Sequence, residues 1–401
     1  MPSLKTLQNT KSLSNPDYDF VSGPSQVTTL RTTLKRIVAE SLYVGVDTET
    51  TGLDPRRNQV RLIQIGSPES ALIVDLDGWR APGDRAVPWE SPGLRELKAF
   101  LEGSTPKVLQ NAAFDLNFLT GERIALGGPV FDTMVAAKLI NNGTGAKNDL
   151  GALTERVLYI KLSKELQKAD WSGDITDEML HYAARDVLCL PMMVEPLTHT
   201  LKSTKPTNTI TLWDLFQIEM GVIHPIALMQ WYGFGFDQQG ALDLKVELEL
   251  QAEELKLEFL DMLDGRIKTR YPEDETLWLP READGSYNTR EKTTGSIRKG
   301  TKVYAGFNPR SPQQMAVRFE QAGIILPKDE DNKPSLDQNL LSFLRKDYKL
   351  IDLYLTWKQA ATRVSNVETL LDSIGPDGRI HCSYRQMGTE TGRLSAASPN
   401  L

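Results

Sequence analysis

The sequence predicts an α/β fold for the first half of the chain and a mostly helical second half. Three strand-like runs, rich in β-branched residues and separated by polar or Gly/Pro turns, lie between positions 42 and 76: LYVGVD, VRLIQIG and ALIVDL. A fourth run, KVLQN at 107–111, is followed by helical stretches near 114–120, 132–141 and 149–158. Strands followed by clustered helices are typical of a sheet covered by helices.

Helical patterning dominates the rest of the chain. A longer helix is expected from about Thr176, because Thr176 or Asp177 can cap its N-terminus. The polar stretch KSTKPTNT at 202–209 indicates a linker. Beyond it we expect a long exposed helix over 240–263, a polar insertion over 266–305 with little core of its own, and renewed helices from Ser311.

Length and composition limit the protein class. A chain of 401 residues predicts two or three domains, since single cores rarely grow past roughly 250 to 300 residues. The hydrophobic fraction of 40% and charged fraction of 25% are those of an ordinary globular protein. A formal charge of -7 argues against coating nucleic acid by bulk positive charge, so any DNA contact has to be local.

The sequence offers little evidence for export, for a disulfide or for a cysteine-bound metal. No run approaches the ~20 apolar residues that cross a bilayer, and the N-terminal stretch has no apolar core of a signal peptide. Cys189 and Cys382 stand far apart without metal-ligand spacing, so neither a disulfide framework nor a zinc site is supported. We expect the cytoplasm of a bacterium or a phage-infected cell, and an organelle stays open.

Carboxylates follow the predicted strands and one helix. Asp47 and Glu49 end the first strand on the same face, because side chains alternate along a strand. Asp115 lies one helical turn after Asn111, and Tyr182 and Asp186 share one helix face at i,i+4 spacing. Each feature alone is more often an ordinary surface, capping or packing residue.

The three segments together point to metal chemistry. Four acids and a phenol on separate elements are a set that chance does not readily produce. Hard oxygen ligands of this kind suit Mg²⁺ or Mn²⁺ rather than zinc. Two such ions roughly 3.5 to 4 Å apart can activate a water and stabilise both the attacking and the leaving oxygen of a phosphodiester.

On these motifs the chain resembles the DEDD exonucleases, in particular the tyrosine-bearing subclass that forms the proofreading domain of family A, DNA polymerase I-like enzymes. The likeness covers about residues 30–200 and includes the connecting stretch NDLGALTERVLYIKLSKELQKADW. The resemblance implies an RNase H-like (DnaQ-like) fold, a mixed sheet flanked by helices. It also implies a 3′-5′ exonuclease with two Mg²⁺ ions, for which Mn²⁺ can substitute.

The resemblance assigns a role to each motif residue. Asp47, Glu49 and Asp186 would hold the ion that carries the attacking water, with Asp47 shared by the second ion. Asp115 would serve the second ion through water. Tyr182 would orient the attacking water together with Glu49, a task for which the phenol need not ionise.

Further positions would contact the substrate DNA strand. Leu53 stands where the family wedges an apolar side chain between the last two bases. Gln110 and Asn111 stand where it contacts the terminal nucleotide.

His181 offers an alternative to Tyr182. It lies five residues before Asp186, the spacing at which the sister subclass carries a catalytic histidine. The YAARD context resembles the tyrosine subclass, so we favour Tyr182 and treat His181 as a bystander.

The second half resembles the thumb of family A polymerases. The stretch HPIALMQWYGFGFD, the long helix after it and FNPRSPQQMAVRFEQAGI carry this likeness. The closing GRIHCSYRQMGTETGRLSAASPNL resembles the TGRLS segment, in which Arg393 and Asn400 would contact the minor groove of primer-template DNA. No palm or fingers motif follows, so we do not expect this chain to polymerise DNA alone. A split polymerase, a truncated one and an exonuclease with a vestigial thumb stay open.

The polar insertion offers three interpretations. It is rich in basic residues that could grip phosphates, and such contacts weaken steeply with salt. In some phage relatives a thumb insertion docks a processivity partner, whereas a solvated loop is the simplest alternative. The basic residues are Arg281, Arg290, Lys292, Arg298, Lys299 and Lys302.

The predicted organisation is an N-terminal extension over 1–30, an exonuclease domain over 31–201, a linker over 202–212, a helical thumb-like region over 213–380 and the start of a palm over 381–401. The predicted function is removal of nucleotides from DNA 3′ ends, with a second chain carrying palm and fingers as a partner. Two rivals remain: an RNase D-like enzyme that trims RNA, whose second half should be compact helical RNA-binding domains, and a non-catalytic DNA-binding subunit of a split polymerase.

Overall fold

The chain forms two compact units in the computed structural model, which describes residues 13–162, 169–289, 293–297, 301–304 and 307–400. One unit contains the described residues up to Gly235 together with those from Gly375 onward, and the other extends from Phe236 to Ile374. No helix in the described part of the chain has the length and apolar character needed to cross a membrane.

The first unit is built on a six-stranded mixed sheet in the order β1-β4-β3-β2-β5-β6. Strands β2, β3 and β4 pair antiparallel, whereas β1 pairs parallel with β4, and β5 pairs parallel with β2 and β6. The strands are β1 (Tyr18–Val21), β2 (Val44–Thr50), β3 (Val60–Gly66), β4 (Ala71–Asp75), β5 (Lys107–Leu109) and β6 (Val130–Asp132).

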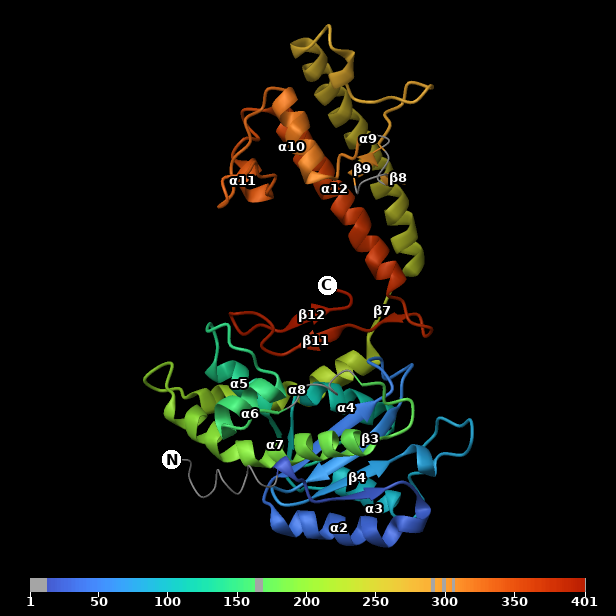
Figure 1. Ribbon diagram of the computed structural model, residues 1–401, viewed down its shortest axis with the longest axis vertical. Helices are drawn as coiled ribbons and strands as arrows, with labels where there is room; N and C mark the ends of the chain where they lie inside the picture. The colour runs from blue at the N-terminus through green and yellow to red at the C-terminus, as the bar shows by residue number, and fades with distance from the viewer. Residues whose placement is uncertain (1–12, 163–168, 290–292, 298–300, 305–306, 401) are drawn as a thin grey trace. The chain divides into compact units, whose positions relative to one another are not determined.

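Helices cover both faces of this sheet (Figure 1). On one face α2 and α3 pack with β2, β3 and β4 in one apolar cluster, and on the other face α7 packs in a second cluster. The RNase H-like prediction of a mixed sheet flanked by helices is therefore confirmed. The helices are α2 (Val27–Glu40), α3 (Leu94–Glu102), α4 (Ala112–Gly121), α5 (Thr133–Ile140), α6 (Leu150–Leu158), α7 (Asp177–Ser203) and α8 (Leu212–Tyr232), with short 3₁₀ turns η1 (Pro24–Gln26) and η2 (Asp77–Trp79).

Two glycines let α7 lie directly on the sheet. Gly45 and Gly66 are cross-strand partners in β2 and β3. A Cβ added at Gly45 would stand 2.4 Å from the carbonyl oxygen of Val187, and one at Gly66 would stand 2.9 Å from Val187 Cγ1. Because these distances are far below van der Waals contact, only a hydrogen at each position allows α7 to sit this close.

We predict that Gly45→Ala lowers the free energy of unfolding of the full chain by about 1–3 kcal/mol, since the new methyl group has to displace α7 backbone. Chemical denaturation followed by circular dichroism measures it. Gly221→Ala is the matched control: Gly221 lies within α8 with nothing near its missing Cβ. That change should be neutral or stabilise by about 0.5–1 kcal/mol. Equal losses in both variants would contradict the packing argument.

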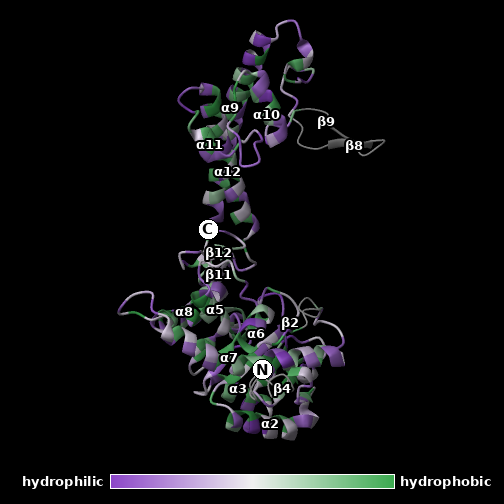
Figure 2. Ribbon diagram, turned by 60° about the vertical axis from the view of Figure 1, so that its left-hand side comes forward, coloured by the Kyte–Doolittle hydropathy of each residue, from purple (hydrophilic) through white to green (hydrophobic). Residues whose placement is uncertain are grey.

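The second unit consists of two long helices with smaller elements around them. Helices α9 (Gln238–Arg270) and α12 (Lys349–Asp372) pack along one another, and Figure 2 shows hydrophobic and hydrophilic residues mixed along both. Their aromatic core includes Phe259 stacked on Trp357 with ring centroids 5.8 Å apart. The remaining elements are α10 (Pro312–Gln321), α11 (Gln338–Ser342), η3 (Glu275–Leu277) and a hairpin of β8 (Thr293–Ile297) and β9 (Thr301–Tyr304).

The predicted insertion begins later than its sequence limits. Residues 266–270 continue α9, because Ile267 is fully buried in the core of the second unit. Arg281 is already engaged, with its Nη2 donating to Asp264 at 3.3 Å and to the Tyr287 hydroxyl at 2.6 Å. The predicted phosphate-binding residues Arg290, Lys292, Arg298 and Lys299 lie outside the described residues, and only the backbone of Lys302 is described.

The C-terminal segment belongs to the first unit. Strand β10 (Arg379–Ile380) pairs with β7 (Phe234–Gly235), and β11 (Ser383–Arg385) pairs with β12 (Ser395–Ala397). Its Gln386 side chain donates to the carbonyl and carboxylate of Glu219 in α8, both at 2.9 Å. The compact units therefore divide the chain differently from the predicted domains, because α8 and residues 375–400 pack with the sheet-bearing unit.

Candidate active site

Strand β2 presents two carboxylates toward α7. Gly45 faces α7, so the alternation of a strand places Asp47 and Glu49 on that same face. Both side chains are half-buried at the end of the strand. The strand thus presents both carboxylates to the same side of the sheet.

Asp115 comes from α4 and is only 2% exposed. The hydroxyl of Thr48, which stands between the two β2 acids, donates to its Oδ1 at 2.6 Å. Thr48 thus ties the second motif to the first. Sequence reasoning assigned no role to Thr48.

Asp132 fixes the start of α4. Its carboxylate accepts hydrogen bonds from the backbone N–H groups of Asn111 and Ala112 at 3.2 and 2.7 Å. It also accepts from Met134 and Val135, and so caps α5 as well. Because one buried carboxylate satisfies the N-termini of two helices, it orients the turn of α4 that carries Asp115. Its place directly before a helical run was a capping signal in the sequence.

Tyr182 and Asp186 meet on α7, which begins after the N-cap residue Thr176 as predicted. The two groups act on one another: Asp186 raises the pKa of the Tyr182 phenol, and the phenol lowers the pKa of the acid. His181 is exposed and packs edge-on against Tyr18, with ring centroids 5.4 Å apart. The phenol, rather than the imidazole, therefore adjoins the acid.

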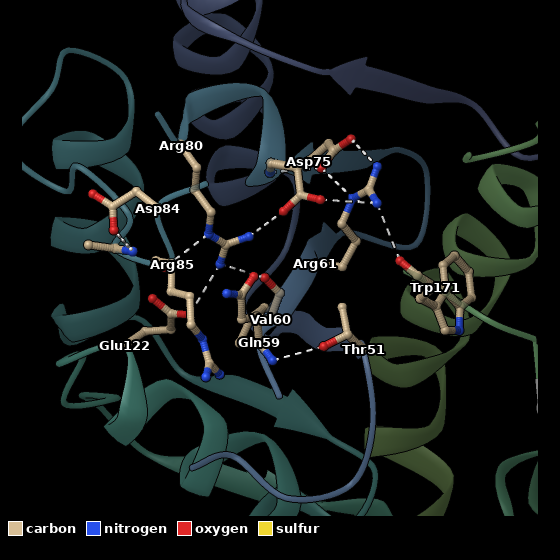
Figure 3. A network of polar contacts seen from close by, with 12 residues as sticks. Thr51, Gln59, Val60, Arg61, Asp75, Arg80, Asp84, Arg85, Glu122 and Trp171 are labelled. Carbon is tan, nitrogen blue, oxygen red and sulfur yellow. Dashed lines mark hydrogen bonds and ion pairs between the residues drawn. The ribbon is translucent and has the colours of Figure 1, made fainter. Parts of the chain in front are cut away.

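A buried arginine supports the segment beside Tyr182. Arg61 in β3 makes two hydrogen bonds to Asp75, at 2.8 and 3.1 Å, and donates to the Trp171 carbonyl at 3.3 Å (Figure 3). The Trp171 indole packs on the Tyr182 ring with centroids 6.5 Å apart. Arg61 therefore acts on the site through Trp171. Its signal in the sequence was a charged side chain, the one such residue in the strand VRLIQIG.

The four carboxyl groups influence one another strongly. Burial raises the pKa of Asp47 to about 7, and burial followed by the Asp47 charge raises the pKa of Asp186 to about 7. Burial also raises the pKa of Glu49, and Asp47, Asp186 and Asp115 raise it further. Burial raises the pKa of Asp115, with Asp47 and Asp132 adding to it. Burial and then Asp186 raise the pKa of Tyr182, so its phenol stays protonated. Glu49 is thus within electrostatic reach of the other three acids.

Such a cluster suits divalent cations by its chemistry. Buried like charges repel unless positive charge is supplied, and carboxylate oxygens are the ligands of Mg²⁺ and Mn²⁺. Within the described ranges, no three acidic, histidine or cysteine side chains stand ready as a preset ligand group. The elements that carry the four acids adjoin one another, so Asp47, Glu49, Asp115 and Asp186 would be the residues that hold such ions.

We predict a characteristic pH dependence in EDTA. Because the pKa values of Asp47 and Asp186 are raised on folding, the folded chain binds more protons than the unfolded one between their ordinary values and about 7. The free energy of unfolding should therefore fall as the pH rises from about 5 to about 8.

Asp47→Asn should flatten this dependence and stabilise the cation-free chain at about pH 8, by on the order of 2 kcal/mol. Denaturation series at several pH values provide the measurement. Parallel curves for the wild type and the variant would contradict the mutual repulsion.

The predicted substrate contacts occupy different settings. Leu53 is 85% exposed, and Asn111 is exposed with a left-handed φ of 63°. Gln110 is held in place, since its Nε2 donates to the Asn148 carbonyl at 2.9 Å and its Oε1 accepts from Thr133. Arg393 and Asn400 lie exposed in the first unit, on and beyond the β11–β12 hairpin.

Comparison with known families agrees with this layout. Residues 21–202 match the family described as 3′-5′ exonuclease, and residues 285–401 match the family described as DNA polymerase family A. Residues 21–202 therefore form a 3′-5′ exonuclease domain, as the carboxylate motifs predicted, and the C-terminal part of the chain is similar to DNA polymerase family A.

Two DNA polymerase I proteins align along nearly the whole chain. DNA polymerase I of Aquifex aeolicus is 24% identical over 399 residues, which cover 96% of this chain and 57% of that protein. DNA polymerase I of Borreliella burgdorferi is 26% identical over 410 residues, covering 98% of this chain and 38% of that protein. The chain thus spans little more than half the length of the first relative and about a third of the second.

A solved structure shares the fold. The POL domain of Pol1 from M. smegmatis, in complex with a DNA primer-template and dNTP, superposes with a TM-score of 0.60 at 21% identity. The match covers 95% of this chain and 55% of that chain. The folds of the sheet-and-helix unit and of the helical unit therefore both occur in that solved structure.

Proposed function

We propose that this chain removes nucleotides from the 3′ end of a DNA strand by hydrolysis that depends on two divalent cations, the proofreading activity of a family A polymerase. One arrangement supports the proposal: Thr48 of β2 bonds Asp115 of α4, α7 lies directly on β2 at Gly45, and the acids of these three elements shift one another's pKa values. Folded proteins seldom keep two buried and two half-buried acids together without a cation to compensate them.

Each residue of the cluster has a distinct task. Asp47, Glu49 and Asp186 hold one ion, and Asp47 with Asp115 serves the other. When bound, the ions supply Lewis-acid stabilisation of the phosphodiester oxygens and lower the pKa of the attacking water. Tyr182 remains a neutral hydrogen-bond donor beside Asp186, which suits it to orient that water rather than to deprotonate it.

The direct test uses the purified full chain with a 5′-labelled single strand of DNA and a matched RNA strand, in Mg²⁺ or in EDTA. We expect Mg²⁺-dependent shortening of the DNA from its 3′ end, with release of mononucleotides. Asp186→Asn should lower the rate by at least about 100-fold, because it removes a cation ligand. Preferred cleavage of RNA would favour an RNase D-like trimming enzyme, and an uncut DNA strand would leave only a non-catalytic DNA-binding subunit.

A second test separates Tyr182 from its neighbour. Tyr182→Phe keeps the ring that packs on Trp171 and removes the hydroxyl beside Asp186, so kcat should fall by about 100-fold. His181→Ala removes an exposed ring and should leave kcat nearly unchanged. Single-turnover cleavage of saturating single-stranded DNA gives both values. The opposite ranking would assign the role to His181.

The broader assembly is also a proposal. Leu53, Gln110 and Asn111 are suited to the terminal nucleotides, and Arg393 and Asn400 to primer-template DNA. A second chain with palm and fingers would complete a polymerase, and the segment within 266–305 is the place for a processivity partner. We propose DNA rather than RNA as the substrate, because the two relatives are named DNA polymerase I. We also propose a cytoplasmic location for this chain.

A further inference from the structure

A buried glutamine lies beside Asp47 without any bonding partner. Gln64 in β3 is the cross-strand partner of Asp47 in β2 and of Ile73 in β4. Its residue is 0% exposed, and neither Oε1 nor Nε2 has a hydrogen-bond partner among the described residues. A buried amide with four unused bonding positions is unfavourable in a folded protein and asks for an explanation.

The setting of Gln64 is otherwise apolar. It stands on the sheet face that α7 covers, where Leu62, Gly66 and Ile73 are its neighbours along β3 and across to β4. A leucine or methionine would be more stable in this environment, since apolar neighbours offer an amide no hydrogen bond. Asp47 is the one polar side chain paired with it across the strands, and directly opposed residues have Cβ atoms about 4.5–5.5 Å apart.

We propose that Gln64 is a positioning residue for the Asp47 carboxylate in its cation-bound form. The inference rests on the proposed function, because it concerns the same carboxylate cluster. The Gln64 side chain stands directly across the strand pair from Asp47, on the face that α7 covers. Its Nε2–H, which has no other partner among the described residues, would donate to that carboxylate and fix its direction when a cation is bound.

A neutral amide suits this role better than a charged group. A lysine or arginine here would cancel the negative charge that attracts the cations, and an acid would add a fifth repelling charge. Thr48 performs the corresponding task for Asp115 through its hydroxyl. Asp47, the acid that both ions would share, otherwise has no side-chain donor comparable to Thr48 in the described part of the cluster.

The experiment compares Gln64→Met with wild type in the full chain. Methionine keeps the length and volume of the side chain and removes the hydrogen bonds. In EDTA, the midpoint of urea unfolding should be unchanged or higher, because an unpaired buried amide is lost. The Mn²⁺ and Mg²⁺ concentrations that half-saturate the thermal stabilisation should rise by about tenfold or more. Cation binding is thus read without reference to cleavage.

Ile73→Met is the matched control. It introduces the same side chain at the neighbouring buried position on the same face, one strand farther from Asp47. It should alter packing without changing the cation response. If Gln64→Met does not fold, Gln64→Leu is measured in the same way.

Unchanged cation affinity in the Gln64→Met variant would overturn the inference. If that variant were also less stable in EDTA, the amide of Gln64 would merely be holding a buried water. Failure of the proposed function looks different. Wild-type protein whose cation affinity depends on Gln64 but which leaves DNA and RNA uncut would sustain the inference and reject the nuclease. A chain that cleaves DNA with a cation dependence insensitive to Gln64 would do the reverse.

Discussion

Mutual repulsion among the four carboxyl groups is the constraint on which the rest of the first unit depends. Isolated acids in such surroundings would spread apart or move to solvent. Here Asp47 and Glu49 are fixed by a central strand, Asp115 by a hydrogen bond from Thr48, and Asp186 by a helix that lies directly on the sheet. The sheet therefore maintains a concentration of negative charge that a flexible chain would not keep.

The close approach of α7 to the sheet also positions one of the four acids. Because Gly45 and Gly66 carry no side chains, the backbone around Val187 rests on the sheet, and its neighbour Asp186 is brought to the level of the β2 acids. Two residues outside the cluster also hold the surrounding chain in place. Arg61 and Asp132 use buried hydrogen bonds to fix the chain on either side of the acids, without approaching as ligands.

Much of this was predictable, for physical reasons that differ by element. Strands β3 and β4 were evident because buried runs of Val, Ile and Leu have few alternatives, and the Thr176 cap of α7 followed from local hydrogen bonding. Helix α2 was not predicted, since its sequence VTTLRTTLKRIVAE is rich in β-branched residues and becomes helical by burying Leu30, Leu34 and Ile37. Spacing also identified the acids, whereas Thr48 and Gln64 gain meaning only from the strand register, which the sequence does not state.

The return of residues 375–400 to the first unit has a consequence for how the protein is made. Strand β10 pairs with β7, and the Tyr384 N–H donates to Gln230 of α8 at 2.8 Å, so the nuclease-bearing body is assembled from both ends of the chain. During synthesis the ribosome releases the two long helices before these closing strands. The sheet can form early, but the part of α8 that residues 375–400 cover stays open until those residues have been made.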